Sequence, residues 1–400
     1  MGEPPLRLGV IGLGRAFMLM RPTLANHPRV RLVAACDPRP EARERFATEF
    51  GGRSYSCVED LCADVGLDAV YIASPHQFHV AHVVCAAAHG RHALVEKPMA
   101  LTLDDCATMT AAARRAGVHL IVGHSHSFDS PVLRARALIA SGVYGQVRMI
   151  TALNYTDFLY RPRRPEELDT AQGGGVVFSQ AAHQVDIVRL LGGGLVRSVR
   201  AATANWDPER PTEGAYTAFL SFADGACASL TYSGYGHFDT DEFCGWVGEL
   251  GQPRDPKRYG EARAGLRRVT TPEAEAALKN ARAYGADAFS VPQGHSNEMR
   301  HHNHFGLVIA SCEKADLRPT TDGVLVYADE ARRFEALPPP AVPRFEVIDE
   351  LYDAVVLGRT PLHDGEWGMA TLEVCLAILS SAKEGREIAL CHQVAAVSHV

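Results

Sequence analysis

The chain has 400 residues, of which 46% are hydrophobic and 22% are charged, as in an ordinary globular protein. This length is more than one compact core usually accommodates, and it predicts two domains. The formal net charge of −7 argues against nucleic acid or an anionic membrane as a partner, because proteins that bind them are usually basic. No run approaches the roughly 20 apolar residues that span a bilayer.

The ten cysteines are scattered along the chain and include no Cys-x-x-Cys pair. Cys36, Cys85 and Cys375 lie in apolar runs, as reduced core thiols do. The first residues also lack the basic segment with which a secretory signal begins. We therefore expect a cytoplasmic protein without a disulfide framework.

The first 125 residues alternate between short apolar, β-rich runs and helical stretches. Thr102 and Asp105 can form a capping box at the start of one helix, and Gly117 is placed to end it. Such alternation is typical of a parallel sheet covered on both faces, so residues 1–127 are predicted to form a doubly wound α/β domain. The predicted strands are residues 6–11, 32–36, 69–73, 93–96 and 119–122, and the predicted helices are residues 41–50, 80–89 and 103–116.

After residue 128, strands follow one another with few helices between them. Ala223-Asp224-Gly225 separates two strands as a hairpin turn. Consecutive strands indicate that residues 128–400 form an α+β domain, with a mostly antiparallel sheet and a helix packed on one face. The predicted strands are residues 146–155, 196–204, 215–222 and 226–232, and the predicted helices are residues 131–140, 178–191, 345–357 and 367–383.

Residues 236–300 have no clear period. They are rich in glycine and charged residues, with one helical pattern at residues 272–283. We interpret them as an irregular excursion over the surface or over an active site.

A glycine-rich turn follows the first predicted strand. Gly12 allows the tight turn, and Gly14 lets the backbone approach a pyrophosphate at the N-terminus of the next helix. Phe17 stands where the third glycine of G-x-G-x-x-G is expected, so the motif alone is weak evidence for a Rossmann domain that binds NAD(P). The candidate cofactor contacts in this turn are Gly12, Leu13, Gly14, Arg15 and Ala16.

Asp37 ends the second predicted strand, where an acidic side chain can accept from the ribose 2′-hydroxyl of an adenosine. A carboxylate there favours NAD over NADP, although Arg39 and Arg43 lie close enough to weaken the preference. The alternative is a structural role for Asp37 in the turn before Pro38.

Two further loops follow predicted parallel strands, whose carboxyl ends face the ligand crevice. The first contains Ser74, Pro75, His76 and His79, of which His79 could instead simply begin a helix.

The second loop is Glu96-Lys97-Pro98. A lysine held beside a nicotinamide cation would have a lowered pKa and could accept or donate a proton. The alternative is an ordinary surface lysine at a strand end.

Several ordered motifs then resemble one family. They are the glycine-rich turn, the Ser74-Pro75 loop with His79, Glu96-Lys97-Pro98, Gly173-Gly174-Gly175 followed by His183-Gln184-Val185-Asp186, Arg359-Thr360-Pro361-Leu362, and Ser381-Ala382 with Gly385-Arg386. Together they are similar to the Gfo/Idh/MocA oxidoreductases, over nearly the whole chain except residues 236–299. That family pairs a Rossmann domain with an open antiparallel sheet, and most members transfer hydride between NAD(P) and a sugar, polyol or related alcohol.

The resemblance implies that Lys97 and His183 are the catalytic acid–base pair. Dehydrogenases of the family usually carry an Asp four residues before this His, and the chain has Ser179 there. Ser179 can still hydrogen-bond a substrate hydroxyl or orient His183, but it supplies no charge. Asp186 either orients His183 or forms an ion pair within its own helix.

An arginine-rich loop and several histidines complete the candidate contacts. Arg161, Arg163 and Arg164 suit carboxylate recognition, which a neutral sugar would not need; the alternative is a solvated basic loop. His124 and His126 follow a parallel strand and are further candidates for substrate contact.

A second histidine group comprises His295, His301, His302 and His304, with Glu298 and Asn303 beside them. Its spacing matches no known metal site. We therefore expect no metal and assign these histidines to substrate contact or interdomain packing.

The arginine loop and the 236–300 excursion are most similar to the phthalate cis-dihydrodiol dehydrogenase branch of the family. This resemblance implies oxidation of a carboxylated cyclic diol to a catechol, with Lys97 removing the hydroxyl proton. The alternatives are a sugar or inositol-type dehydrogenase and a non-catalytic nucleotide-sensing regulator. We also expect a homo-oligomer, a dimer or a tetramer, because an open sheet face is an association surface.

Overall fold

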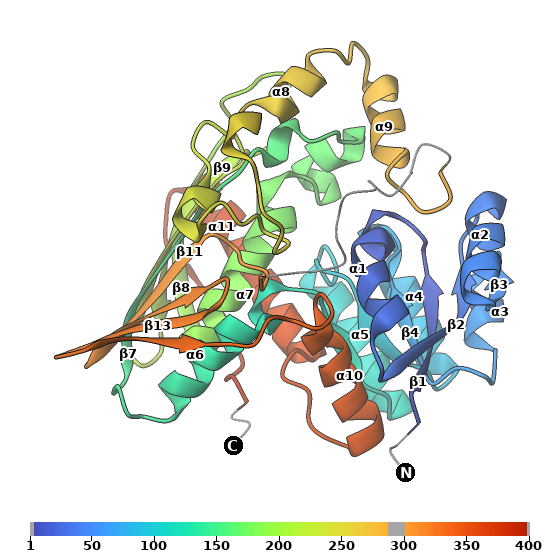
Figure 1. The fold of residues 1–400 in the computed structure, drawn as a ribbon, viewed down its shortest axis with the longest axis horizontal. Coiled ribbons are helices and arrows are strands. Elements are labelled where there is room, and N and C mark those ends of the chain that lie inside the picture. The colour runs from blue at the N-terminus through green and yellow to red at the C-terminus, as the bar shows by residue number, and fades with distance from the viewer. Residues whose placement is uncertain (1–3, 287–300, 398–400) are drawn as a thin grey trace. The chain divides into compact units, whose positions relative to one another are not determined.

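The computed structural model describes residues 4–286 and 301–397, which form two compact units (Figure 1). The first unit comprises residues 4–124, 277–286 and 341–369. The second unit comprises residues 125–276, 301–340 and 370–397. Residues 277–286 and 341–369 therefore lie in the first unit, although we predicted that everything after residue 127 belongs to the second domain.

The first unit is built on a six-stranded parallel sheet with the order β3-β2-β1-β4-β5-β6. This confirms the doubly wound prediction, and β3 is the strand that the prediction missed. The strands are β1 (Leu6–Ile11), β2 (Val30–Cys36), β3 (Arg53–Tyr55), β4 (Ala69–Ile72), β5 (His92–Val95) and β6 (Leu120–Val122). The helices between them are α1 (Arg15–Asn26), α2 (Pro40–Phe50), α3 (Val58–Cys62), α4 (His79–Ala88) and α5 (Leu103–Ala116).

Local signals explain how α5 begins and ends. The Thr102 side chain accepts a hydrogen bond from the backbone nitrogen of Asp105, and Gly117 ends the helix in the left-handed conformation. One face of α5 buries Cys106, Met109 and neighbouring alanines. Capping and periodicity therefore act together, as the sequence predicts.

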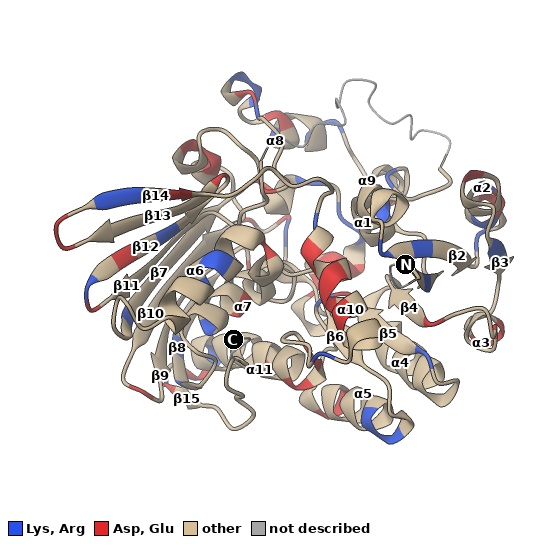
Figure 2. Cartoon of the chain, turned by 60° about the horizontal axis from the view of Figure 1, so that its bottom comes forward, with Lys and Arg blue, Asp and Glu red and all other residues tan. Residues whose placement is uncertain are grey.

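Helix α10 (Phe345–Leu357) belongs to the first unit, buries apolar residues, and carries acidic positions that are coloured red on its ribbon in Figure 2. Arg29, just before β2, forms ion pairs with Asp349 and Asp353. After α10, the carbonyl of His363 accepts a hydrogen bond from the backbone nitrogen of Val122 in β6. A C-terminal segment therefore completes the N-terminal fold.

The second unit is built on a nine-stranded mixed sheet with the order β14-β13-β12-β11-β7-β10-β9-β8-β15. Every neighbouring pair is antiparallel except β7 and β10, which confirms a mostly antiparallel sheet. The strands from β11 to β14 were not predicted. The bounds are β7 (Val147–Tyr155), β8 (Val196–Ala204), β9 (Ala215–Phe222), β10 (Cys227–Ser233), β11 (Leu307–Cys312), β12 (Ala315–Thr320), β13 (Gly323–Ala328), β14 (Arg332–Ala336) and β15 (Ile388–Ala389).

Helices α6 (Ser130–Ala140) and α7 (Ala182–Leu191) pack on this sheet. The prediction of one helix over residues 178–191 is only partly right, because its first turn, Val177–Ala181, is π-helical. Such turns are rare and frequent at functional sites. Helix α11 (Gly365–Glu384) follows α10 in the chain.

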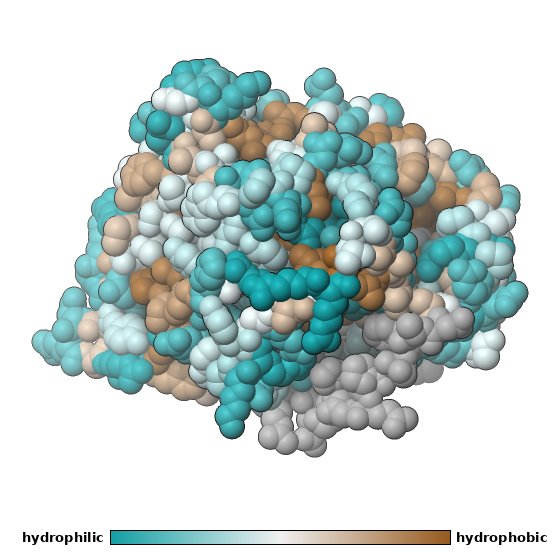
Figure 3. Space-filling model, turned by 90° about the horizontal axis from the view of Figure 1, so that it is seen from above, coloured by the Kyte–Doolittle hydropathy of each residue, from teal (hydrophilic) through white to brown (hydrophobic). Residues whose placement is uncertain are grey.

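Between β10 and β11, residues 236–276 are mostly irregular. They contain the short helix α8 (Glu261–Leu266) and the start of α9 (Pro272–Asn280), in neither of which is any residue buried. The face that includes α8 and α9 is mainly hydrophilic, with its hydrophobic residues in small separate groups (Figure 3). Among the described residues, no helix is both long and apolar enough to cross a membrane.

Candidate active site

The glycine-rich turn of the first unit has the tight geometry that the motif predicts. Gly12 has a φ of +94°, and a Cβ there would lie 2.8 Å from the backbone nitrogen of Ser74. Gly14 is the N-cap of α1, so this helix begins directly after the turn. Phe17, at the third-glycine position, is fully buried and packs edge-on against Tyr284, with ring centroids 5.1 Å apart. The aromatic contact thus takes the place of the close packing that a third glycine would allow.

Asp37 is buried at the end of β2 and holds the glycine-rich turn. Its Oδ2 accepts from the backbone nitrogen of Leu13 at 2.8 Å, and its Oδ1 accepts from Nε of Arg39 at 2.9 Å. Arg39 also donates to the carbonyls of Leu13 and Tyr284, at 2.8 and 3.1 Å. Arg43 donates to the carbonyl of Asp37. Both arginines are therefore partly satisfied by the protein itself.

His79 connects the loops that follow β4 and β5. Its Nε2 lies 3.0 Å from the carbonyl oxygen of Ser74, and its Nδ1 lies 3.1 Å from that of Pro98. Burial lowers the pKa of His79 to about 4, so the ring is neutral at pH 7 and donates through one nitrogen at a time. Its geometry is that of a bridge between the two loops.

The other loop candidates lie beside this bridge. Lys97 is half-buried directly after β5. The neighbouring Glu96 accepts from the Tyr71 hydroxyl at 2.5 Å, and burial raises the pKa of Glu96. Ser74 lies 2.9 Å from Nδ1 of His82, and His124 is buried after β6. His76 is half-buried and Pro75 is exposed.

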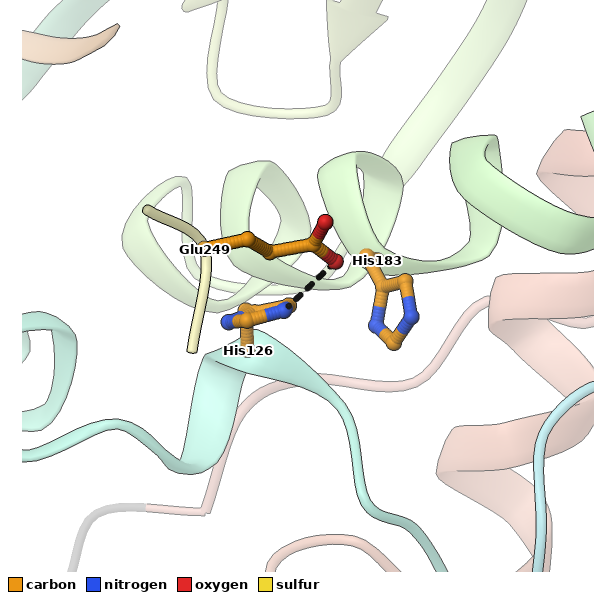
Figure 4. Close-up of side chains that lie close together, drawn as sticks. All are labelled: His126, His183 and Glu249. Carbon is orange, nitrogen blue, oxygen red and sulfur yellow. Dashed lines mark ion pairs between the residues drawn. The ribbon is translucent and has the colours of Figure 1, made fainter. Parts of the chain in front are cut away.

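A second group of charged side chains lies within the second unit, around His126 (Figure 4). His126 Nδ1 lies 2.7 Å from Oδ2 of Asp129, and its Nε2 lies 3.4 Å from Oε1 of Glu249. Burial opposes protonation of His126, but the two carboxylates outweigh it and raise its pKa to about 9. Burial likewise opposes the charge of Glu249, yet His126 and Arg161 lower its pKa to about 2. The imidazole thus lies between two carboxylates.

His183, in the first turn of α7, belongs to the same group. One donor atom each from His126, His183 and Glu249 lies within 4.8 Å of the others. The ring of Phe305 packs against both imidazoles, with centroid distances of 5.1 Å. Ser179 is half-buried in the π-helical turn one turn before His183. The second unit therefore joins two imidazoles, a carboxylate and an aromatic ring.

Asp186 has other close partners. Its carboxylate accepts from the hydroxyls of Ser127 and Thr371, the latter at 2.8 Å. Thr371 also accepts from the fully buried guanidinium of Arg189 at 2.7 Å. This network ties α7 to the segment after β6. The orientation of His183 by Asp186 stays a prediction.

The structure brings only one of the three loop arginines to the histidine group. Arg161 donates to Asp157 at 2.8 Å and lies 3.9 Å from Glu249. Arg163 instead packs over the Phe158 ring, 3.6 Å from its centroid, and donates to the Phe158 carbonyl. Arg164 faces Glu166 and Glu167, at 3.2 and 3.6 Å. Arg161 is thus the candidate that a substrate carboxylate could use.

The predicted second histidine group is not a cluster in the described part of the chain. His301 pairs with Asp322 at 2.6 Å, and His302 contacts the carbonyl of Pro338. His304 lies 2.8 Å from the carbonyl of Val247. His295 and Glu298 lie outside the described residues, and Asn303 is buried.

Sequence reasoning missed three members of the site. They are Glu249 from the excursion, Asp129 after β6 and Phe305 before β11. No local motif marks Glu249 and Phe305, because both meet the site residues only through contacts far away in the chain. Asp129 alone could have been found from the sequence, because it follows the candidate His126 by three positions.

Comparisons with known proteins agree with this architecture. A model of the oxidoreductase family with an NAD-binding Rossmann fold matches residues 6–124, and one of the GFO/IDH/MocA C-terminal domain matches residues 132–252. The chain is 49% identical over 381 residues to the 1-carboxy-3-chloro-3,4-dihydroxycyclohexa-1,5-diene dehydrogenase of Comamonas testosteroni, covering 94% of this chain and 95% of that relative.

Solved structures show the same fold. A structure named as a dehydrogenase of Bordetella bronchiseptica RB50 is 44% identical, covers 96% of this chain and all of that one, and has a TM-score of 0.90. The WlbA dehydrogenase of Bordetella pertussis, solved with NADH and UDP-GlcNAcA, is 23% identical with a TM-score of 0.69, covering 98% of this chain and 99% of that one. The chain belongs to the Gfo/Idh/MocA family of NAD(P)-dependent oxidoreductases.

Proposed function

We propose that this enzyme oxidises a carboxylated cyclic cis-dihydrodiol to a catechol with NAD⁺. The observation that carries the proposal is the guanidinium of Arg161 beside the histidine group of the second unit. Arginine binds carboxylates through paired, charge-assisted hydrogen bonds, so it suits an acidic substrate. The nearly full-length similarity to an enzyme named for a carboxylated dihydroxycyclohexadiene supports the same substrate class.

In the proposed reaction, NAD⁺ accepts the two electrons that the substrate loses. One ring carbon transfers its hydride to NAD⁺ while its hydroxyl loses a proton to the protein, which leaves a ketone and NADH. The ketone tautomerises to a catechol, and the aromatic product favours the forward direction.

We propose Lys97 and His183 as the proton-transfer residues, and His124, Arg161 and Ser179 as substrate contacts. Arg163 and Arg164, held by Phe158 and by two glutamates, are weaker candidates.

The first unit supplies the cofactor contacts in this proposal. They comprise the glycine-rich turn, the loops after β4 and β5, and Asp37. NAD is proposed over NADP because the buried Asp37 carboxylate would repel a 2′-phosphate. The guanidinium of Arg39 is already bonded to Asp37 and to two backbone carbonyls.

Replacing Asp37 tests this preference. We expect Asp37→Ala to raise the KM for NAD⁺ about 10- to 100-fold, the value of a lost charge-assisted hydrogen bond, and to improve the relative use of NADP⁺. The exposed Asp60→Ala is the control. Steady-state kinetics with both cofactors measure the effect, and an unchanged cofactor ratio would exclude the proposed role of Asp37.

The alternatives predict different substrates. A sugar or inositol dehydrogenase would need no guanidinium near its site, whereas the Arg161 guanidinium lies 3.9 Å from Glu249 of the histidine group. A nucleotide-sensing regulator would need neither Lys97 nor His183. The proposal is tested by the absorbance of NADH with aromatic cis-dihydrodiols, with and without carboxylates, and with inositols and aldoses. Turnover of inositols or aldoses alone would support the first alternative, and no turnover with any class would support the second.

We also propose a homo-oligomer that associates through the open face of the nine-stranded sheet. Strand register places Met149, Phe219, Tyr327 and Phe334 on one face, where each is 39–49% exposed. The opposite face carries buried residues such as Ile150 and Leu230. A row of exposed large apolar side chains is typical of an association surface.

Light scattering after gel filtration tests this surface. We expect the wild type to have the mass of a dimer or tetramer of the 43.3 kDa chain, and Phe219→Asp to shift it toward the monomer. Val143→Asp, at an exposed position outside the strands, is the control. A monomeric wild type would contradict the proposal.

The enzyme is further proposed to work in the reducing cytoplasm, because Cys36, Cys62 and Cys106 are buried thiols in apolar surroundings.

A further inference from the structure

His126, His183 and Glu249 come from three distant segments of the chain and meet within the second unit (Figure 4). They offer two imidazole nitrogens and one carboxylate oxygen, which is a ligand set of catalytic zinc and iron sites. The distance between Nε2 of His126 and Oε1 of Glu249 is 3.4 Å. Two ligand atoms at tetrahedral positions around one zinc ion are also about 3.4 Å apart, given bonds of about 2.1 Å. The donor atoms of the full set lie within 4.8 Å of one another, so His183 would move closer when an ion binds.

The neighbours of these three residues resemble the outer partners of a metal site. Asp129 lies 2.7 Å from Nδ1 of His126, so it holds a proton on that nitrogen and leaves Nε2, which faces Glu249, as the nitrogen that could bind an ion. Arg161 lies 3.9 Å from the Glu249 carboxylate and is itself held by Asp157 at 2.8 Å. Histidine ligands of metals are usually oriented by a carboxylate in this way.

The local charge also matches a divalent cation. The group contains three carboxylates, from Asp129, Asp157 and Glu249. The Arg161 guanidinium contacts the last two. An ion at Nε2 of His126 would displace the ring proton that otherwise faces Glu249, and three carboxylates with one guanidinium would then leave two negative charges in a partly buried environment. Buried charge is costly unless it is paired, and one divalent ion would balance it.

We propose that His126, His183 and Glu249 bind one divalent transition-metal ion of the Zn²⁺ or Fe²⁺ class. Three protein ligands leave coordination positions open, as in catalytic sites. This part rests on the proposed function: the two oxygens of a vicinal cis-diol could occupy those positions, and coordination would lower the pKa of the hydroxyl. In that case His183 would be an ion ligand in place of the proton-transfer role given to it in the proposed function, and Lys97 alone would accept the proton.

The metal content of the full-length protein, purified without a histidine tag, is the first test. Elemental analysis should find about one equivalent of a transition metal. After removal by a chelator, titration with Zn²⁺ should show one tight site, and Co²⁺ should give the visible absorption bands of a protein-bound ion. These readouts do not require the substrate to be known, so they are independent of the proposed function.

Three variants locate the site. Glu249→Gln and His126→Asn should each weaken Zn²⁺ binding at least 100-fold, and the outer-partner change Asp129→Asn should weaken it about 10- to 100-fold. His301→Asn, at a histidine paired with Asp322, is the matched control and should bind normally. Circular dichroism checks that each variant is folded.

Either of two results would overturn the proposal. One is wild-type protein that binds Zn²⁺ no more tightly than Glu249→Gln. The other is protein that is purified without a chelator, holds no transition metal and has full dehydrogenase activity, which would leave the proposed function intact and favour pairing of a protonated His126 with Asp129 and Glu249.

Discussion

Lys97→Ala is expected to lower kcat for the dihydrodiol by about 10²- to 10⁴-fold, the usual contribution of a positioned acid–base group. The reason is that hydride departure from the ring carbon requires simultaneous loss of the hydroxyl proton. The KM for NAD⁺ should change less than kcat, because the other proposed cofactor contacts, among them the glycine-rich turn and Asp37, are untouched. Stopped-flow absorbance of NADH in a single turnover measures the chemical step directly.

Lys257→Ala, at an exposed lysine in the 236–276 segment, is the matched control for Lys97 and should retain full activity. Thermal unfolding should show that Lys97→Ala is folded. If Lys97→Ala transfers hydride at the wild-type rate, Lys97 is not the proton acceptor, and the strand-end lysine has only a surface role.

Arg161→Ala is expected to raise the KM for a carboxylated dihydrodiol about 10- to 100-fold, which corresponds to about 1.5–3 kcal/mol for a hydrogen bond to a charged group. A neutral dihydrodiol should be affected much less, because it offers no carboxylate to the guanidinium. Steady-state kinetics with the two substrates compare the effects within one variant.

Arg164→Ala provides the comparison for Arg161, because it removes a guanidinium three residues away that already faces Glu166 and Glu167. It should leave both KM values unchanged. Equal losses with the neutral and the carboxylated substrate would mean that Arg161 supports the loop through Asp157, and the carboxylate proposal would then be wrong.

The parts of the fold that depend on local signals could be predicted from the sequence. The bounds of β1, α5, β8, β9 and α10 agree with the predicted ranges, because their apolar periods and turn residues act within a few positions. Strands β12 and β14 lack such a signal. Pro319 interrupts the first, and Arg332-Arg333 begins the second, so pairing with neighbouring strands rather than local propensity determines them.

The candidate site was predictable only where residues near in sequence act together. The glycine-rich turn and Asp37 follow from strand ends, and the structure joins them through the Leu13 backbone. Glu249 and Phe305 could not be found this way, because tertiary folding brings them to His126 and His183 from 60 or more positions away. The role of Arg161 likewise became distinct from that of Arg163 only when their neighbours were known.

Following the ring hydrogen tests most directly whether this enzyme transfers a hydride from a carboxylated cis-dihydrodiol to NAD⁺. A carboxylated cis-dihydrodiol labelled with deuterium at its two carbinol carbons would be incubated with the enzyme and NAD⁺, and both products analysed by mass spectrometry. We predict one deuterium in the reduced nicotinamide for each molecule of carboxylated catechol formed. A catechol that appears without labelled NADH, or no reaction at all, would contradict the account.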